Sequence, residues 1–243
     1  MAESVSGQFL GEGTYSTVTK DTERNVAIKT FKEARDPNAI QEICILKYLQ
    51  HDNIVHVNSI HLDANGMWKL YMRLYSFDLS KDWRSYITNI HPVAVLCKIM
   101  HDVSSGIHYM HNNLVIHCDI KPHNILFDTN NMRAVITDLN LAVYNPQTML
   151  STRVQTSNYR APEVDFSKKY GQFGYLIDIY SIGCVMYWLL TCERFVGIVD
   201  DDSTRGCCDA LGLPMYSNRT ERYFVLKSLM HHQLVTVLSE RVN

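Results

Sequence analysis

The distribution of hydrophobic and polar positions in the first third of the chain predicts extended segments. Extended segments of this kind cover residues 9–18, 26–29, 56–62 and 68–75. The first contains a Gly-x-Gly turn, and the last two are joined by Asn65-Gly66, a dipeptide that favours tight hairpin turns. The pattern predicts a strand-rich N-terminal part.

A helical period interrupts these strands. The triplet Asp36-Pro37-Asn38 is a helix-start signal, because proline fits the first turn of a helix. From residue 39 to residue 49, apolar side chains recur at helical spacing, at Ile40, Ile43, Leu46 and Leu49. An amphipathic helix is therefore predicted here, and Glu42 lies on it.

The later part of the chain has longer helical patterns. Residues 82–89 and 93–111 both show the helical period. A helix from Asp178 to about residue 190 is apolar nearly all round, which is typical of a buried helix. Apolar positions near the end of the chain predict one closing helix or two, and they are Leu226, Leu229, Met230, Leu234 and Leu238.

Composition narrows the function classes. The 243 residues suit one large domain or two lobes, and a net charge of −2 gives no basic field for nucleic acid. No apolar run reaches the roughly 18 residues that a membrane span needs. The segment Met1-Ala2-Glu3-Ser4 lacks a secretory signal and the glycine that myristoylation requires. A soluble intracellular protein, cytoplasmic or nuclear, is expected, with neither nucleic acid nor membrane as a partner.

Cysteine and histidine spacing favours ordinary structural roles. Seven cysteines are scattered without a C-x-x-C pair, so reduced thiols are the favoured interpretation. His108 and His111 lie one turn apart on a predicted helix and raise a metal hypothesis. A histidine-bearing helix surface is the simpler interpretation of that pair.

Residues 117–124, H-C-D-I-K-P-H-N, place an acid, a cation and an amide on one short loop. Apolar runs at 114–116 and 125–127 predict two buried strands that hold this loop rigidly. Another strand is predicted over residues 134–137, ending on Asp138. The pattern D-x-K-P-x-N followed by a strand-end aspartate resembles the catalytic loop and metal-binding turn of protein kinases.

Motifs upstream of this loop resemble protein kinases in the same order. A Gly-x-Gly turn alone is a weak signal, since hairpins use glycine routinely. Here a strand ending on Lys29 follows, rather than the helix of a dinucleotide-binding fold. The resemblance implies an α+β, bilobal protein-kinase-like fold, with residues 1–243 as a single kinase domain. Its expected parts are a small N-terminal lobe (1–75) with an antiparallel sheet, a hinge (76–78) and a mainly helical, shortened C-terminal lobe (79–243).

The resemblance also assigns the nucleotide site. Lys29 is expected to bind the α- and β-phosphates of ATP, and Glu42 to form the ion pair that fixes Lys29. Leu74 takes the gatekeeper position before the hinge, and Val18 and Ala27 form the apolar lid over adenine. The full expected set is Gly11, Glu12, Gly13, Thr14, Tyr15, Ser16, Val18, Ala27, Lys29, Leu74 and Leu126.

Four polar residues of the loop region carry the expected chemistry. Asp119 is the expected base for the acceptor hydroxyl, and Lys121 neutralises the transferred phosphoryl group. Lysine at this place marks serine/threonine kinases in the family. Asn124 and Asp138 are the expected ligands of Mg²⁺, with Mn²⁺ as an alternative.

Two further residues are expected to support the loop. Thr156 should bridge Asp119 and Lys121, because it closes the segment that follows the metal-binding turn in the family. Asp178 should accept hydrogen bonds from the backbone of the catalytic loop rather than touch substrate.

The sequence departs from the family pattern at two positions. Asp138-Leu139-Asn140 replaces D-F-G, where leucine still packs apolarly and asparagine tolerates left-handed geometry. Cys118 replaces the arginine of H-R-D, so the clamp for an activation-loop phosphate is absent. Activity is therefore expected not to depend strongly on phosphorylation at Ser151 or Thr152.

Several motifs are similar to the cyclin-dependent kinase branch, and the resemblance covers about residues 8 to 214. They are Gly11-Glu12-Gly13-Thr14-Tyr15, Ala39-Ile40-Gln41-Glu42-Ile43, Tyr159-Arg160-Ala161-Pro162-Glu163 and Leu211-Gly212-Leu213-Pro214. The resemblance implies a cyclin-like regulatory partner on the helix from Ala39 to Ile43, protein substrates, and inhibitory phosphorylation of Thr14 and Tyr15. Arg160 implies acceptors with proline after the phosphorylated residue.

Three functions remain open on the sequence. The leading hypothesis is a serine/threonine protein kinase that transfers the γ-phosphate of ATP to protein hydroxyls. Asn140 and Cys118 motivate an alternative, a pseudokinase or decoy that sequesters a cyclin-like partner. The third is a scaffold that senses ATP without transferring it.

Overall fold

The computed structural model describes residues 7–34, 36–81, 92–145, 154–161, 164 and 174–191. The chain divides into two compact units. The first consists of Met1–Val115 with Pro122–Tyr144, and the second of Ile116–Lys121 with Asn145–Asn243. The chain therefore passes from one unit to the other within the predicted catalytic loop.

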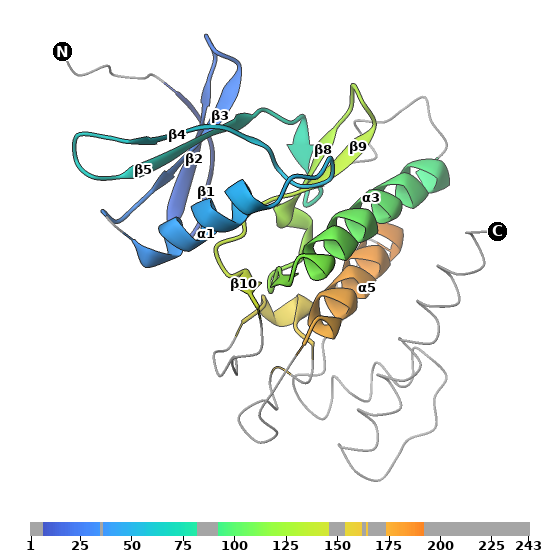
Figure 1. The fold of residues 1–243 in the computed structure, drawn as a ribbon. Coiled ribbons are helices and arrows are strands. Elements are labelled where there is room, and N and C mark those ends of the chain that lie inside the picture. Colours follow the sequence, from blue (N-terminus) through green and yellow to red (C-terminus); the bar gives the residue numbers. More distant parts are fainter. Residues whose placement is uncertain are drawn as a thin grey trace, which may run out of the picture. The chain divides into compact units, whose positions relative to one another are not determined.

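A five-stranded antiparallel sheet forms the N-terminal part of the first unit, as the family resemblance implies (Figure 1). Its strands, in sheet order, are β1 (Gln8–Glu12), β2 (Ser16–Asp21), β3 (Val26–Phe31), β5 (Trp68–Arg73) and β4 (Val57–Leu62). The central strand β3 places Lys29 between Val18 of β2 and Leu70 of β5. A charged residue at the middle of a sheet is buried, and it needs a partner.

Helix α1 (Pro37–Tyr48) begins where the sequence predicts. Asp36 caps it, since its carboxylate accepts a hydrogen bond from the backbone N–H of Asn38 at 2.8 Å. The buried residues of this helix are Ala39, Glu42, Ile45 and Leu46. Ile40, which the periodicity groups with the apolar stripe, is instead 45% exposed. Leu46 and Leu49 of that stripe are buried, and Glu42 lies on the same inward side of the helix.

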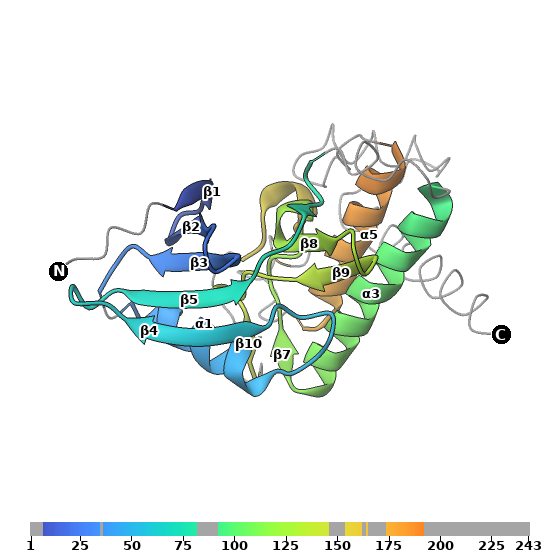
Figure 2. The same ribbon diagram turned by 90° about the horizontal axis from the view of Figure 1, so that it is seen from above.

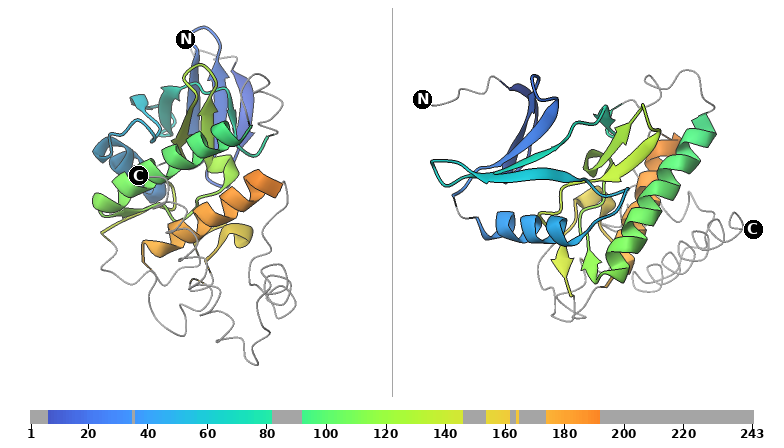
Figure 3. Two further views of the ribbon diagram at one scale, coloured as in Figure 1. Left: turned by 90° about the vertical axis from the view of Figure 1, so that its right-hand side faces the viewer. Right: turned by 45° about the horizontal axis from the view of Figure 1, so that its top comes forward.

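A second sheet of the first unit consists of β6 (Phe77–Asp78), β8 (Ile125–Asp128) and β9 (Arg133–Ile136). Helix α3 (Pro92–Asn112) lies along β9, and Figures 2 and 3 show the two side by side. The helix predicted over residues 93–111 is thus confirmed, whereas that over 82–89 lies outside the described residues.

Gly106 explains how closely α3 approaches its neighbours. A Cβ atom at this position would lie 2.8 Å from Ile136 Cδ1 and 2.9 Å from the carbonyl oxygen of Asn53. Both distances are shorter than van der Waals contact, so any side chain here would push α3 away from β9 and from the loop after α1. Glycine costs some helix stability but permits this contact.

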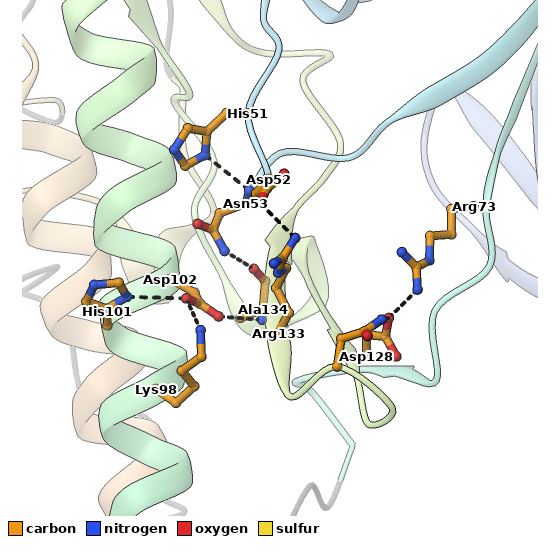
Figure 4. A network of polar contacts seen from close by, with 11 residues as sticks. His51, Asp52, Asn53, Arg73, Lys98, His101, Asp102, Asp128, Arg133 and Ala134 are labelled. Atoms are coloured by element: carbon orange, nitrogen blue, oxygen red, sulfur yellow. Dashed lines mark hydrogen bonds and ion pairs between the residues drawn. The ribbon is translucent and has the colours of Figure 1, made fainter.

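Strand β9 lies at the edge of its sheet, and buried polar side chains cover its outer backbone groups (Figure 4). The carboxylate of Asp102 on α3 accepts a hydrogen bond from the N–H of Ala134 at 3.0 Å. Asn53, in the loop after α1, donates from Nδ2 to the carbonyl oxygen of Ala134 at 2.9 Å. Lys98 lies 2.5 Å from the Asp102 carboxylate and compensates its burial. The edge is therefore closed to further strand pairing.

The elements that adjoin the predicted catalytic loop are short. Strand β10 (Val143–Tyr144) pairs with β7 (Val115–Ile116), and a 3-10 turn, η1 (Pro122–Asn124), precedes β8. An ion pair between Arg73 and Asp128, at 2.6 Å, joins the end of β5 to the end of β8.

The described core of the second unit is helix α5 (Leu176–Thr191), together with a 3-10 turn, η2 (Ser157–Tyr159). The apolar residues Ile177, Ile182, Val185 and Leu189 of α5 are buried, as is typical of a helix without a polar face. The closing helices predicted near residues 226–238 lie outside the described residues. Among the helices that the structure describes, none has the length and hydropathy of a membrane span.

Candidate active site

Three charged side chains of the first unit meet at one point, namely Lys29, Glu42 and Asp138. The Nζ atom of Lys29 lies 2.7 and 2.8 Å from the two carboxylate oxygens of Glu42 and 2.6 Å from Oδ1 of Asp138. They come from β3, α1 and the segment after β9, so the ion pairs tie together elements that are 13 and 109 residues apart. Lys29 is 5% exposed and Glu42 only 1%, whereas a third of the Asp138 side chain faces solvent.

The charge state of this cluster follows from burial and attraction. Burial alone would lower the pKa of Lys29, but the carboxylates of Glu42 and Asp138 together raise it to about 12. Burial raises the pKa of Glu42, and the attraction of Lys29 offsets this only in part. Lys29 is therefore a permanent cation at neutral pH, held by its partners and presented beside the partly exposed Asp138.

The turn after β9 holds Asp138 in an unusual backbone conformation. Its φ is +63°, a left-handed value that is rare for residues other than glycine. The sequence suggested that Asn140 suits left-handed geometry, but in this turn the left-handed residue is Asp138. Leu139 is fully buried, as expected for an apolar residue at that place. The side-chain oxygen of Asn140 is buried without a hydrogen-bond partner.

Asn124 lies close to the same turn. Its carbonyl oxygen accepts a hydrogen bond from the N–H of Thr137, the residue before Asp138, at 3.0 Å. The donor set of Asn124 and Asp138 is one carboxamide and one carboxylate, both hard oxygen ligands. These two residues therefore fit Mg²⁺, which takes one or two protein oxygens and completes its shell with phosphate and water.

The glycine-rich turn between β1 and β2 is closed by its own backbone. The N–H of Gly13 donates to the carbonyl oxygen of Ser16 at 2.8 Å, and Lys32 donates to the carbonyl oxygen of Gly13 at the same distance. A Cβ atom on Gly11 would meet nothing within 4 Å, and neither Gly11 nor Gly13 has a positive φ. The described packing of the protein therefore leaves room for a side chain at both glycines.

The remaining expected nucleotide residues lie on neighbouring strands of the first unit. Ala27 is buried and Val18 half-buried, and Leu126 of β8 pairs in register with Asp78. The N–H of Ser76 donates to the carbonyl oxygen of Phe127 at 3.0 Å, which fixes the predicted hinge against β8. Leu74 is half-buried just before it.

In the second unit, Asp119, Lys121 and Thr156 form a closed cluster. Lys121 donates to one carboxylate oxygen of Asp119 at 2.6 Å and to the hydroxyl of Thr156 at 3.1 Å. Thr156 donates to the other oxygen of Asp119 from its hydroxyl at 2.8 Å and from its N–H at 3.0 Å. The predicted bridge by Thr156 is confirmed, and it holds the carboxylate of Asp119 in one fixed orientation.

Asp178 fixes the backbone of the same loop, as predicted. Its two carboxylate oxygens accept hydrogen bonds from the N–H groups of His117, at 2.8 Å, and Cys118, at 3.0 Å. Cys118 has a left-handed φ of +64°, so the pair of bonds holds a strained residue directly before Asp119. Asp178 is fully buried at the start of α5.

Comparison with known proteins shows the family to which the chain belongs. Residues 4–222 match the protein kinase domain. The chain belongs to the protein kinase family. It is 33% identical over 231 residues to cyclin-dependent kinase 7 of Dictyostelium discoideum, covering 86% of this chain and 61% of that protein. The match to cyclin-dependent kinase E-1 of Arabidopsis thaliana is 32% identical over 204 residues, 75% of this chain and 43% of the relative.

A third relative is cyclin-dependent kinase 4 of Xenopus laevis, which is 27% identical over 237 residues, 88% of this chain and 73% of that kinase. The chain spans about three fifths of the length of the cyclin-dependent kinase 7 proteins that it matches. The resemblance to cyclin-dependent kinases is thereby confirmed, and with it the protein-kinase fold class.

Some residues of this kinase domain carry no signal in its sequence motifs. Lys32 pairs with Glu12 at 2.6 Å and holds the glycine-rich turn, but a lone lysine after a strand has no distinctive pattern. Asn53 and Gln155 make their contacts with residues far away in sequence.

Four residues named in the sequence analysis lie outside the described residues, and they are Ser151, Thr152, Pro162 and Glu163.

Cys118 replaces the arginine of the kinase loop with a neutral buried group. Its side chain is fully buried, and burial together with the charges of Asp178 and Asp119 raises the pKa of the thiol. The thiol therefore stays protonated and offers no cation to a phosphate group.

We expect Cys118 to be inert toward alkylation in the folded kinase domain. Because the thiolate is the reactive form, iodoacetamide at pH 8 should modify the exposed Cys44 at least about 100-fold faster than Cys118. Peptide mass spectrometry of timed samples measures both rates, and unfolding in denaturant should make them similar. Equal rates in the native protein would show that the loop around Cys118 is not packed as described.

Proposed function

We propose that this kinase domain transfers the γ-phosphate of ATP to serine and threonine hydroxyls of proteins. The observation that carries the proposal is the buried cluster of Lys29, Glu42 and Asp138, because structural roles alone rarely gather three charges at one buried point. Lysine at position 121, two residues after Asp119, supports serine and threonine as acceptors.

On the nucleotide side, each residue has a defined task. Lys29 neutralises the α- and β-phosphates, and Glu42 keeps its ammonium in place. Asn124 and Asp138 would hold Mg²⁺, or Mn²⁺ as an alternative. Bound there, the metal supplies positive charge to the phosphate oxygens. The backbone of the glycine-rich turn covers the phosphates, and apolar side chains contact adenine; these are Val18, Ala27, Leu74 and Leu126.

On the acceptor side, Asp119 accepts the proton of the attacking hydroxyl. The bonds from Lys121 and Thr156 hold its carboxylate in a fixed orientation for this transfer. Lys121 donates to the phosphoryl group as its charge moves toward the acceptor. Thr156 prevents Asp119 from turning away.

We call residues 154–160 the P+1 segment, because they are expected to contact the residue that follows the phosphorylated one. Its geometry supports a preference for proline at that place in the acceptor. Gln155 has a left-handed φ of +68°, and its carbonyl oxygen accepts a hydrogen bond from Arg160 Nη2 at 2.6 Å. If the residue after the phosphorylated one has a backbone N–H, the carbonyl of Gln155 is not available to accept it, because Arg160 already donates to that carbonyl. Proline has no backbone N–H, so a substrate with proline at that place loses no hydrogen bond when it binds.

A cyclin-like partner is proposed for the exposed face of α1. Ile40, Cys44 and Tyr48 follow one another at helical spacing and are all exposed. The exposed ring of Tyr144 packs edge-on against Tyr48, with ring centres 5.7 Å apart. An apolar stripe left open on the helix that carries Glu42 suits a protein partner that would fix that helix. The same stripe favours the second candidate function, a decoy that sequesters the partner without catalysis.

We expect Asp119→Asn to lower phosphate transfer by roughly 100-fold or more, because the acceptor hydroxyl then has no base. Transfer of radiolabelled phosphate from ATP to a generic protein substrate, with Mg²⁺ or Mn²⁺ and purified cyclins present, measures this. Asp52→Asn, at an exposed surface ion pair, removes the same charge and should leave the rate unchanged.

Two results would contradict the catalytic proposal. Wild type that transfers no more than Asp119→Asn, but binds a cyclin, would favour the decoy. ATP-dependent thermal stabilisation without any transfer would favour the scaffold.

We expect Tyr48→Glu to weaken cyclin binding at least about tenfold, because a charge would enter the apolar contact. Titration of the labelled kinase domain against a panel of purified cyclins measures the affinity. Leu62→Glu on β4 is the matched control, since Leu62 and Tyr48 are both 54% exposed. Equal weakening by both variants, or no binding to any cyclin, would contradict the proposed partner surface.

A further inference from the structure

Gln155 combines two features that are unusual for glutamine. Its side chain is buried, with 4% exposed, and its backbone is left-handed. Asparagine, aspartate and histidine are the non-glycine residues enriched in that conformation, and glutamine is not among them. Some interaction must therefore hold the residue in place.

The side-chain amide of Gln155 provides that interaction. Nε2 donates to the carbonyl oxygen of Ile177 at 2.9 Å and to the hydroxyl of Ser181 at 2.8 Å, both on α5. Oε1 accepts the N–H of Ala161 at 2.9 Å. Both donors and the acceptor are thus engaged, so rotation of the side chain would leave several buried polar groups unpaired.

Neighbouring bonds extend the network around the P+1 segment. The hydroxyl of Ser181 donates to the carbonyl oxygen of Tyr159 at 2.7 Å. Arg160 donates from Nε to the carbonyl oxygen of Val154 at 2.9 Å and from Nη2 to that of Gln155. The guanidinium therefore spans two consecutive carbonyls only while the peptide after Gln155 keeps its present direction.

We propose that Gln155 is a positioning residue for acceptor specificity. By anchoring to α5, its side chain holds its own carbonyl toward Arg160, and this denies a hydrogen bond to the backbone N–H of the residue that follows the phosphorylated one. The inference rests on the proposed proline-directed kinase activity. Without the amide, the residue relaxes toward negative φ, the carbonyl leaves Arg160, and it can accept that N–H.

The experiment compares two peptides that differ only in proline or alanine after the acceptor serine. The ratio of their kcat/KM values is measured with the full chain, Mg²⁺ and ATP, and with any cyclin that activates it. An unpaired buried donor disfavours a bound state roughly 5- to 150-fold, so wild type should prefer proline by at least about tenfold. A ratio within one enzyme is insensitive to the fraction that is folded, which a purely structural defect would change.

Three variants test the role of the side chain. Gln155→Met keeps the length without hydrogen bonds and should reduce the ratio at least about fivefold, through a gain on the alanine peptide. Ser181→Ala removes one partner of Gln155 and should reduce the ratio at least about twofold, which keeps the test valid if Gln155→Met does not fold. Gln50→Met changes an exposed glutamine and should leave the ratio unchanged.

The outcomes separate this inference from the proposed function. Proline preference that persists unchanged in Gln155→Met, or in Ser181→Ala where Gln155→Met does not fold, overturns the inference and leaves the kinase proposal intact. Transfer by wild type without proline preference overturns the inference together with proline direction. Absence of transfer by wild type under every condition overturns the proposed function itself.

Discussion

The buried ammonium of Lys29 is the constraint on which the first unit depends. A charge on the central strand of a sheet is stable only if opposite charges reach it, and Glu42 and Asp138 do so from different elements. The orientation of α1 follows, because the helix must turn Glu42 inward even though this leaves Ile40 in solvent. The turn after β9 follows as well, since Asp138 needs its left-handed backbone at the point where it contacts Lys29.

Three of the seven left-handed residues other than glycine that the structure describes lie at the sites for which we propose chemistry. Asp138, Cys118 and Gln155 have φ values between +63° and +68°, and none is glycine. Each is held by a charged or buried hydrogen bond. Lys29 donates to the carboxylate of Asp138, the N–H of Cys118 donates to Asp178, and the side-chain amide of Gln155 donates to the carbonyl oxygen of Ile177. Strain of this kind persists only where surrounding bonds determine it, so these three turns are expected to be rigid before any substrate binds. Rigid placement is what catalysis by positioning and charge requires.

Local signals in the sequence were enough for the strands, the helix start at Asp36 and the buried helix α5. The contacts of Thr156 and Asp178 were also predicted, because family resemblance relates positions that are far apart in the chain. The ion pair between Lys29 and Glu42 was predicted and is present, whereas Ile40, part of the predicted apolar stripe of α1, is exposed. Asn53 and Gln155 could not be found from sequence, because their partners lie 81 and up to 26 residues away and no spacing rule connects them.

A double-mutant cycle on Lys29 and Glu42 tests the central claim most directly. The free energy of unfolding is measured by denaturant titration for wild type, Lys29→Met, Glu42→Gln and the double variant. A buried mutual ion pair predicts a coupling energy of about 1–3 kcal/mol, with the double variant less destabilised than the sum of the single ones. Strictly additive losses would contradict the claim, because they would mean that the two charges do not depend on each other in the folded protein.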